Sequence, residues 1–282
     1  MRHKPRKSQW RAAILVTFAT MLVVLFIAWT FSDIIVPAAG SVELPPDFSA
    51  FATQAQVRDL PDTGYLQLVD RDMEISAPLD HSRLATLWPG IPVRATYITV
   101  QETAATALSG LFAAASQAGY ANLFIASGYR SYDQQRTLYM DAADRAYAAP
   151  PGHSEHQLGL AVDILISDSD NMRGTDEAAW LAANAPIFGF VLSYPEDKQD
   201  VTGTPYEPWH FRYVGRVHAW FMGQQNFVLT EYIAHLQEIG GYIGELDGRI
   251  YYVLYQRPQN GMIFVPEHME FQLSSANTGA IL

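Results

Sequence analysis

Two short segments of the chain hold histidines close to carboxylates. The first reads SEHQLGLAVD and contains His156 and Asp163, and the second reads EPWH and contains Glu207 and His210. A catalytic zinc takes three protein ligands, commonly nitrogen or carboxylate oxygen, and leaves a further position for water. His156, Asp163 and His210 supply a two-histidine, one-carboxylate set of that kind. The two segments therefore predict a zinc site able to carry out hydrolysis.

Glu207 has a different role in this prediction. It lies three residues before His210, close enough to reach water at the metal instead of the metal itself. Bound zinc can lower the pKa of such water to about 7, and a neighbouring carboxylate can accept its proton. We expect Gly159 to let the chain bend between the first two ligands. The expected chemistry is attack of water on a carbonyl carbon without a covalent enzyme intermediate.

Composition limits the other possibilities. The 282 residues carry a formal net charge of −11, which argues against nucleic-acid binding because such proteins present basic faces to phosphates. The chain has no cysteine, so thiolate metal sites, cysteine nucleophiles and disulfides are excluded. Hydrophobic residues make up 49% of the chain, enough to form a packed core.

The amino-terminal segment is basic and then apolar. Residues 12–31 read AAILVTFATMLVVLFIAWTF without a charge or a proline, and twenty helical residues span about 30 Å, the thickness of a bilayer's hydrocarbon core. We predict that residues 1–32 form a basic cytoplasmic stub and a single transmembrane anchor. A signal peptide cleaved near PAAG at 37–40 is the alternative. Both alternatives place the rest of the chain outside the cytoplasm, and the anchor would hold it at the cell membrane.

The remaining chain is predicted to be an α+β protein in three parts. A linker over 33–62 precedes a folded domain over 63–220, and a C-terminal α/β extension covers 221–282. Inside the domain, apolar periodicity and turn residues predict the following elements. They are helices at 101–118, 131–147 and 176–184, and strands at 65–69, 122–127, 158–166 and 190–193.

The C-terminal extension is predicted to contain one helix and one hairpin. Residues 231–239 have a helical pattern. Residues 250–256 and 262–265 are rich in β-branched and aromatic side chains, and Asn260-Gly261 between them is a strong tight-turn signal. We expect these two segments to pair with each other. No chemistry is indicated here, so the extension is expected to serve packing and solubility.

The motifs together resemble a known family. SEHQLGLAVD is similar to the S-x-H-x-x-G-x-A-x-D motif, and EPWH to the E-x-W-H motif, of the VanY-type D-alanyl-D-alanine carboxypeptidases. These zinc peptidases share their fold with the hedgehog signalling domain. The upstream segment SGYRSYDQQ at 127–135 resembles the family's S-G-Y-R-S-x-x-x-Q segment. The resemblance covers about residues 63–220 and implies a small, mostly antiparallel central sheet flanked by helices.

The resemblance implies a role for each matching position. His156, Asp163 and His210 would bind one Zn²⁺ per chain, and Glu207 would act as general base. Arg130 would polarise the scissile carbonyl and stabilise the oxyanion, and a guanidinium suits this role because it stays cationic at any working pH. Gln135 and Ser154 correspond to family positions that hold the substrate's terminal residue and its carboxylate, and Tyr194 corresponds to a tyrosine that lines the same substrate-binding pocket.

The expected reaction is removal of the C-terminal D-alanine from peptidoglycan stem peptides by a metal-activated water. Outward orientation, anchoring and the motifs agree on this substrate, and no protein partner is implied. An L,D-carboxypeptidase that trims tetrapeptide stems, an inactive peptidoglycan-binding module and a lytic endopeptidase are the alternative functions. Among single residues, Arg130 in a surface ion pair and His153 as a competing ligand are the alternatives.

Overall fold

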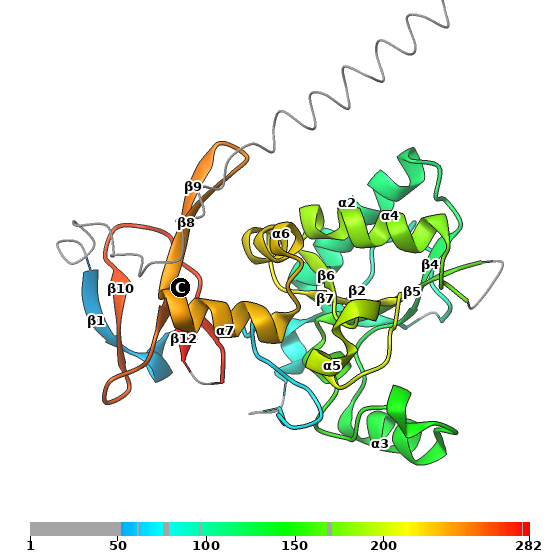
Figure 1. The fold of residues 1–282 in the computed structure, drawn as a ribbon, viewed down its shortest axis with the longest axis horizontal. Helices are drawn as coiled ribbons and strands as arrows, with labels where there is room; N and C mark the ends of the chain where they lie inside the picture. The colour runs from blue at the N-terminus through cyan, green and yellow to red at the C-terminus, as the bar shows by residue number, and fades with distance from the viewer. Residues whose placement is uncertain (1–51, 61, 76–78, 96, 168–170, 278) are drawn as a thin grey trace, which may run out of the picture.

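The computed structural model describes residues 52–60, 62–75, 79–95, 97–167, 171–277 and 279–282. The predicted transmembrane segment and the alternative processing site lie outside these residues. In the described ranges, no helix has both the length and the apolar composition needed to cross a bilayer. The described chain forms two lobes side by side (Figure 1), which we call the central lobe (84–225) and the C-terminal lobe (229–282, with 52–56).

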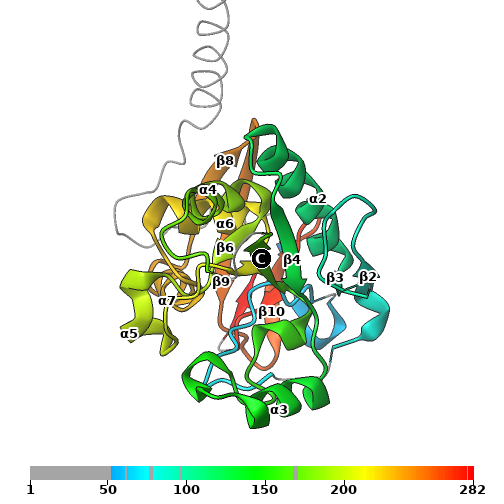
Figure 2. The ribbon, with the colours of Figure 1, turned by 90° about the vertical axis from the view of Figure 1, so that its right-hand side faces the viewer.

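A four-stranded sheet lies at the centre of the central lobe (Figure 2). Each pair of neighbouring strands is antiparallel, as the resemblance to the zinc peptidases implied. The strand order is β4 (Leu123–Ser127), β5 (Ala161–Ile166), β7 (His210–Tyr213) and β6 (Phe190–Leu192).

The register between β5 and β7 assigns side chains to two faces of this sheet. Asp163 is paired with His210, and Val162 is paired with Phe211. Successive side chains of a strand point to opposite faces. Val162 and Phe211 face the apolar core, so Asp163 and His210 share the other face. Directly paired side chains have Cβ atoms roughly 4.5–5.5 Å apart, which brings two predicted ligands together.

Two helices contribute to the apolar core under the sheet. Helix α2 (Glu102–Gln117) buries Leu108 and Leu111, and helix α4 (Asp176–Asn184) buries Leu181. These side chains form one cluster with apolar residues of β4, β5 and β7. Both helices lie where the sequence pattern predicts them. The core they form supports the strands that carry the site.

Helix α3 (Tyr132–Asp141) begins directly after Ser131, the first residue of the segment that was predicted to be helical. Ser131 Oγ accepts the backbone N–H of Gln134, and the Gln134 side chain accepts the N–H of Ser131, which is a capping box. The helix ends earlier than predicted, because the backbone is extended at Ala142. A separate 3₁₀ turn, Arg145–Tyr147, follows it.

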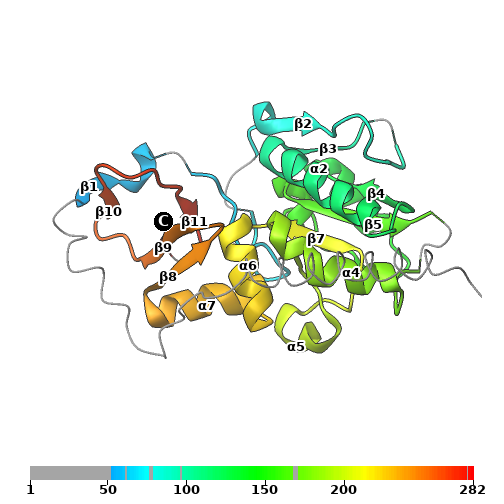
Figure 3. The same cartoon turned by 90° about the horizontal axis from the view of Figure 1, so that it is seen from above.

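Short elements complete the central lobe. Strands β2 and β3 pair antiparallel, and α6 leads out of the sheet toward the C-terminal lobe (Figure 3). The bounds are β2 (Leu84–Thr86), β3 (Thr99–Gln101), α5 (Gln199–Thr202) and α6 (Arg216–Gln225).

The strand predicted at 65–69 is not formed. The carbonyls of Tyr65 and Gln67 accept hydrogen bonds from the Arg212 side chain and not from a neighbouring strand. The apolar pattern has another cause, because Leu66 and Val69 are buried in two different apolar clusters. We call residues 63–70 the bridging segment.

The C-terminal lobe consists of one helix and short strands. Strand β1 (Ala52–Gln56) pairs with β10, and four further strands form a sheet in the order β11-β12-β9-β8. The bounds are α7 (Leu229–Ile239), β8 (Gly241–Leu246), β9 (Arg249–Gln256), β10 (Met262–Pro266), β11 (Ser274–Ser275) and β12 (Ala280–Ile281).

The hairpin predicted between 250–256 and 262–265 was wrong. Strand β9 pairs with β8 instead, through a turn in which Asp247 and Gly248 have φ values of 54° and 72°. Asn260-Gly261 does form a tight turn, with φ values of 53° and 75°, but it closes only a single bridge. Both dipeptides fit a two-residue turn with positive φ, so local sequence does not decide which turn joins long strands.

The linker predicted at 33–62 needs a correction over its last third. Residues 52–56 are strand β1, and their partners in β10 lie more than 200 positions later in the chain. Such a pairing leaves little local signal, because no residue of β1 is buried and two of its five residues are exposed. The N-terminal part of the described chain is therefore held by the C-terminal lobe.

The two lobes share an apolar core. Val191 and Val214 of the central lobe and Leu66 of the bridging segment belong to one buried cluster with Tyr232 and Tyr242 of the C-terminal lobe. The predicted boundary between residues 220 and 221 falls inside α6, which supplies side chains to this cluster.

Candidate metal centre

His156, Asp163 and His210 lie together on one face of the sheet. Asp163 Oδ1 is 3.3 Å from His156 Nε2 and 3.1 Å from His210 Nδ1. One potential ligand atom from each residue lies within 4.8 Å of the others. The two imidazole rings are close to perpendicular, with centroids 4.9 Å apart. The structure thus brings together the three residues predicted as ligands.

His156 is oriented by the turn that carries it and by a backbone carbonyl that contacts its ring. It lies in the 3₁₀ turn Glu155–Leu158, which ends at Gly159 in a left-handed conformation with φ 66°. Its Nδ1 is 2.7 Å from the carbonyl oxygen of Gly128, and a carbonyl can only accept, so Nδ1 carries the proton and Nε2 faces Asp163. A Cβ at Gly128 would lie 2.6 Å from the carbonyl oxygen of Thr99, so only glycine fits there.

His210 is oriented by a carboxylate. Its Nε2 lies 3.0 Å from Glu155 Oε2, while its Nδ1 faces Asp163. Glu155 also accepts hydrogen bonds from Arg212 Nη1 at 3.0 Å and from Ser193 Oγ at 2.7 Å. Sequence reasoning missed Glu155, Arg212 and Ser193. A signal was present for Arg212, a charged residue two positions after His210 in a strand and hence on the same face.

The protonation of the cluster follows from burial and contacts. Burial, together with the nearby Arg130, lowers the pKa of His156 to about 4. Burial alone would also lower the pKa of His210, but its hydrogen bonds to Asp163 and Glu155 raise it to about 10. Burial would raise the pKa of Asp163, yet the two histidines hold it well below its usual range. The pKa values of the two buried imidazoles are therefore shifted in opposite directions, because the carboxylates outweigh burial only at His210.

Glu207 lies beside the three converging residues. Its Oε2 is 3.9 Å from His210 Nδ1, and its backbone carbonyl accepts the N–H of His210. Burial raises the pKa of Glu207 to about 7, against the attraction of His210. A carboxyl group with such a pKa can both accept and donate a proton near neutral pH.

Arg130 is held at the edge of the cluster. Its Nη2 donates to Asp163 Oδ2 at 2.9 Å, its Nη1 donates to Gln135 Oε1 at 3.2 Å and its Nε donates to Ser127 Oγ at 3.1 Å. The side chains of Arg130 and Asp163 are only 20% and 14% exposed, so this is not the surface ion pair considered above. Gln135 is fixed in turn by a bond to the carbonyl of Ala149.

The other predicted residues have different positions. The ring of Tyr194 lies against His210, with centroids 4.9 Å apart, and burial together with Glu155 raises its pKa well above the ordinary value. Ser154 is buried next to Glu155 at the start of the 3₁₀ turn. His153 is not part of the converging set, because its Nδ1 lies 2.8 Å from the carbonyl oxygen of Asp70.

The donor set fits a divalent cation such as zinc. Two imidazole nitrogens and one carboxylate oxygen match the ligands of catalytic zinc sites. The outer nitrogen of each imidazole is bonded to an oxygen, the carbonyl of Gly128 for His156 and the carboxylate of Glu155 for His210. Such outer bonds fix the tautomer and ring orientation of metal-binding histidines.

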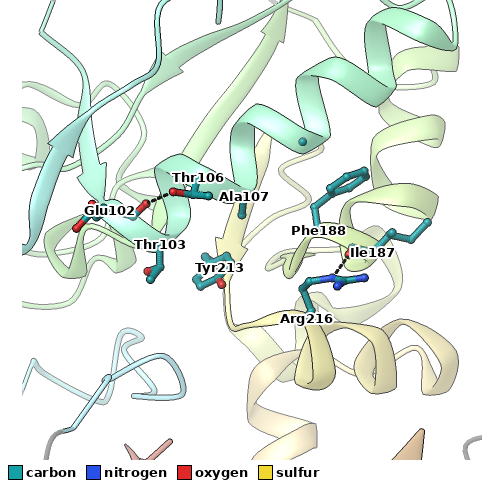
Figure 4. A pocket seen from close by; sticks show the side chains of 9 residues that line it. Glu102, Thr103, Thr106, Ala107, Ile187, Phe188, Tyr213 and Arg216 are labelled. Carbon is teal, nitrogen blue, oxygen red and sulfur yellow. Dashed lines mark hydrogen bonds between the residues drawn. The ribbon is translucent and has the colours of Figure 1, made fainter. Parts of the chain in front are cut away.

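A groove of about 650 Å³ lies elsewhere in the central lobe (Figure 4). It runs between α2, the turn Ala185–Phe188 and the start of α6, and Phe188, Tyr213 and Arg216 contribute to its walls. His156, Asp163 and His210 are not among the residues that line this groove. We therefore take the cluster, where ionisable groups meet, as the functional site.

Comparison with known proteins points to one family. Residues 97–216 match the family model of VanY, D-alanyl-D-alanine carboxypeptidase. The chain is 38% identical over 169 residues to a D-alanyl-D-alanine carboxypeptidase of Enterococcus faecium. That alignment covers 60% of this chain and 55% of the relative, so the chain spans about half the length of this relative.

Two solved structures are also similar to the chain. The LD-carboxypeptidase LdcB has a TM-score of 0.54 and 32% identity, over 60% of this chain and 85% of that one. A variant of the vancomycin-resistance D,D-pentapeptidase VanY, in complex with Zn(II), has a TM-score of 0.51 and 35% identity, over 60% of this chain and 98% of that one. With nearly all of that VanY structure matched, the chain belongs to the VanY family of D-alanyl-D-alanine carboxypeptidases.

Proposed function

We propose that this protein is a zinc-dependent D-alanyl-D-alanine carboxypeptidase that removes the C-terminal D-alanine of peptidoglycan stem peptides. The observation that carries the proposal is the convergence of His156, Asp163 and His210, with Glu207 Oε2 3.9 Å from His210 Nδ1. The Zn(II) in the similar VanY structure supports the choice of metal, and the names of the relatives support the substrate.

In this proposal the residues divide the work of hydrolysis. One Zn²⁺ per chain, held by His156, Asp163 and His210, would polarise the scissile carbonyl and lower the pKa of a water molecule. Glu207 accepts a proton from the water that attacks the carbonyl carbon. When the C–N bond breaks, Glu207 donates that proton to the leaving amine of D-alanine. Burial favours the protonated form of Glu207, which helps it to hold the proton between the two steps.

Arg130 is proposed to stabilise the negative charge that develops on the carbonyl oxygen. Its three side-chain bonds hold the guanidinium beside the cluster before substrate binds. Gln135, Ser154 and Tyr194 are proposed to contact the terminal residue and its carboxylate. The contact between Tyr194 and His210 supports a position of this tyrosine next to the reaction centre.

We also propose that residues 12–31 anchor the protein in the cell membrane, with the catalytic domain outside the cytoplasm. The uninterrupted apolar run and the preceding basic residues support this. Protease added to intact spheroplasts should degrade the catalytic domain. Protection of the domain until the cells are lysed would contradict the orientation.

The function is tested by mass spectrometry of stem peptides incubated with the zinc-loaded, full-length protein. We expect a pentapeptide ending in D-alanyl-D-alanine to lose one D-alanine, and a chelator to stop the reaction. A metal-bound protein that releases no amino acid from any stem peptide would overturn the proposal.

An L,D-carboxypeptidase is the second candidate, because the chain is about equally similar to LdcB in TM-score and identity. It would use the same metal site and would differ in the shape of the substrate site. Comparing turnover of pentapeptide and tetrapeptide stems separates the two activities. An inactive binding module is disfavoured because Glu207 and Arg130 both lie beside the cluster.

A further inference from the structure

A series of buried polar groups leads from the metal centre toward the C-terminal lobe. It begins at His210, whose Nε2 lies 3.0 Å from Glu155 Oε2. The other oxygen of Glu155 accepts a bond from Arg212 Nη1 at 3.0 Å. The Arg212 side chain has no exposed surface, and that of Glu155 is 5% exposed. The carboxylate that orients His210 is thus itself positioned by a fully enclosed guanidinium.

Arg212 is in turn positioned by the bridging segment, residues 63–70. Its Nη2 donates to the carbonyl oxygens of Tyr65 and Gln67, each at 3.1 Å. A guanidinium enclosed in this way needs its full set of acceptors, because a buried charge without partners is strongly unfavourable. The two carbonyls and Glu155, together with the carbonyl of Tyr213 that accepts from Arg212 Nε at 3.2 Å, therefore fix the place of Arg212. A shift of the bridging segment would move Arg212 and the carboxylate bound to it.

Side chains of the C-terminal lobe hold the bridging segment. The N–H of Leu66 donates to Ser274 Oγ at 2.8 Å. The N–H of Leu68 donates to Asn277 Oδ1 at 3.0 Å, and Asn277 Nδ2 donates back to the carbonyl of Leu68 at 2.9 Å. These bonds alternate with the carbonyls of Tyr65 and Gln67 that point to Arg212. In Figure 3 this part of the chain runs between the two lobes.

We infer that the C-terminal lobe positions the metal centre through this series, with Glu155 and Arg212 as positioning residues for His210. Ser274 and Asn277 fix the bridging segment, the segment fixes Arg212, and Arg212 fixes Glu155 against His210 Nε2. The inference rests on the proposed metal site, and it gives the C-terminal lobe a role beyond packing and solubility.

The direct test uses Glu155→Gln in the full-length protein. A neutral amide can present its nitrogen to His210 and disturb the tautomer that leaves Nδ1 free for metal. We expect the affinity for Zn²⁺, measured by competition with a chelator, to fall about 10–100-fold. The visible absorption of the Co²⁺-substituted protein should change as well, because it depends on ligand geometry.

The distant test uses Ser274→Ala combined with Asn277→Ala, neither of which touches the metal centre. The double variant removes the side-chain bonds to Leu66 and Leu68. We expect Zn²⁺ affinity to fall roughly threefold to tenfold, less than for Glu155→Gln because the effect is transmitted. Thermal unfolding of each variant, followed by circular dichroism, tests whether the variant is folded before its Zn²⁺ affinity is compared with that of the wild type.

Gln256→Ala is the matched control. The Gln256 side chain also makes two bonds to backbone within the C-terminal lobe, to the carbonyl and the N–H of Phe264, but it does not contact the bridging segment through them. The Zn²⁺ affinity of the Gln256→Ala variant should stay within about twofold of that of the wild type, as expected for a substitution that is independent of the metal site. Equal affinity in the control and in the folded Ser274 and Asn277 double variant would overturn the inference. Failure of the wild-type protein to bind Zn²⁺ would instead overturn the proposed function.

Discussion

Two histidines in different regions of the molecule have opposite pKa shifts. His210, in the metal centre, bonds to the carboxylates of Asp163 and Glu155, and these raise its pKa to about 10 although burial opposes them. His218, on α6 in the core shared by the lobes, bonds to the hydroxyl of Tyr232 at 2.7 Å, and burial lowers its pKa to about 4. Enclosure alone favours the neutral imidazole, and only neighbouring charge reverses it.

The surroundings of the two histidines differ in the same way. Around His210 lie carboxylates and guanidinium groups whose opposite charges compensate one another in ion pairs. Around His218 the Tyr232 hydroxyl is 3.2 Å from that of Tyr242, whose ring stacks on Phe221 with centroids 4.3 Å apart. Changes in the charged region should therefore affect chemistry, and changes in the aromatic region should affect stability.

The largest expected effect comes from Glu207→Gln in the charged region. The amide keeps the shape of the side chain but cannot accept a proton, so kcat for D-alanine release should fall about 10²–10⁴-fold. Metal content should remain that of the wild type, because Glu207 lies outside the converging set. Activity within tenfold of wild type would remove Glu207 from the role of general base.

A smaller effect is expected from pH in the aromatic region. Because the pKa of His218 is lowered to about 4 when folded, the unfolded chain binds one more proton between that value and about 6.5. The contribution of His218 to the free energy of unfolding is complete above about pH 6.5 and is lost as the pH falls toward 4. In this window the free energy of unfolding changes by up to about 1.4 kcal/mol per pH unit.

This pH effect is measured by urea unfolding of wild type and His218→Gln between pH 4.5 and 7.5. These pH values cover most of the window from about 4 to about 6.5 and extend above it. The variant should show the shallower loss of stability on the acid side. Parallel curves for the two proteins would mean that His218 titrates normally in the folded state.

The smallest effect is expected from Tyr242→Phe. The phenyl ring keeps the stacking on Phe221, and only the hydrogen bond to Tyr232 is lost. The free energy of unfolding should fall by about 1 kcal/mol, as measured in urea. Zn²⁺ affinity should not change, so a weakened metal site in this variant would show that the two regions are not separate.

The metal centre was more predictable from sequence than the network behind it. His156 and Asp163 lie seven residues apart in one motif, and Glu207 and His210 lie three apart in another, so local spacing carried the chemistry. Glu155 gains its role from Arg212, which is 57 positions away. Nothing in the local sequence of either residue indicates that pairing, since it depends on how β7 lies against the turn that carries Glu155.

The fold shows the same division. Helices α2 and α4 and the strands β4, β5 and β6 of the central sheet follow from local sequence patterns, and they were predicted, whereas strand β7 of the same sheet was not. The pairing of β1 with β10 was not, because the two strands lie at opposite ends of the described chain. In the C-terminal lobe, two Asx-Gly turns offered equal local signals, and long-range packing decided which one joins long strands.

The register of β5 against β7 has a consequence for engineering this protein. Asp163 faces the same side as His210 only while their pairing is kept. Deleting or inserting one residue early in β5 would turn Val162 toward the two imidazoles and the carboxylate of Asp163 toward the apolar core. Variants with one residue inserted in β5 should therefore lose all function. Variants with one residue inserted in the exposed turn at Asp247 and Gly248 should keep it.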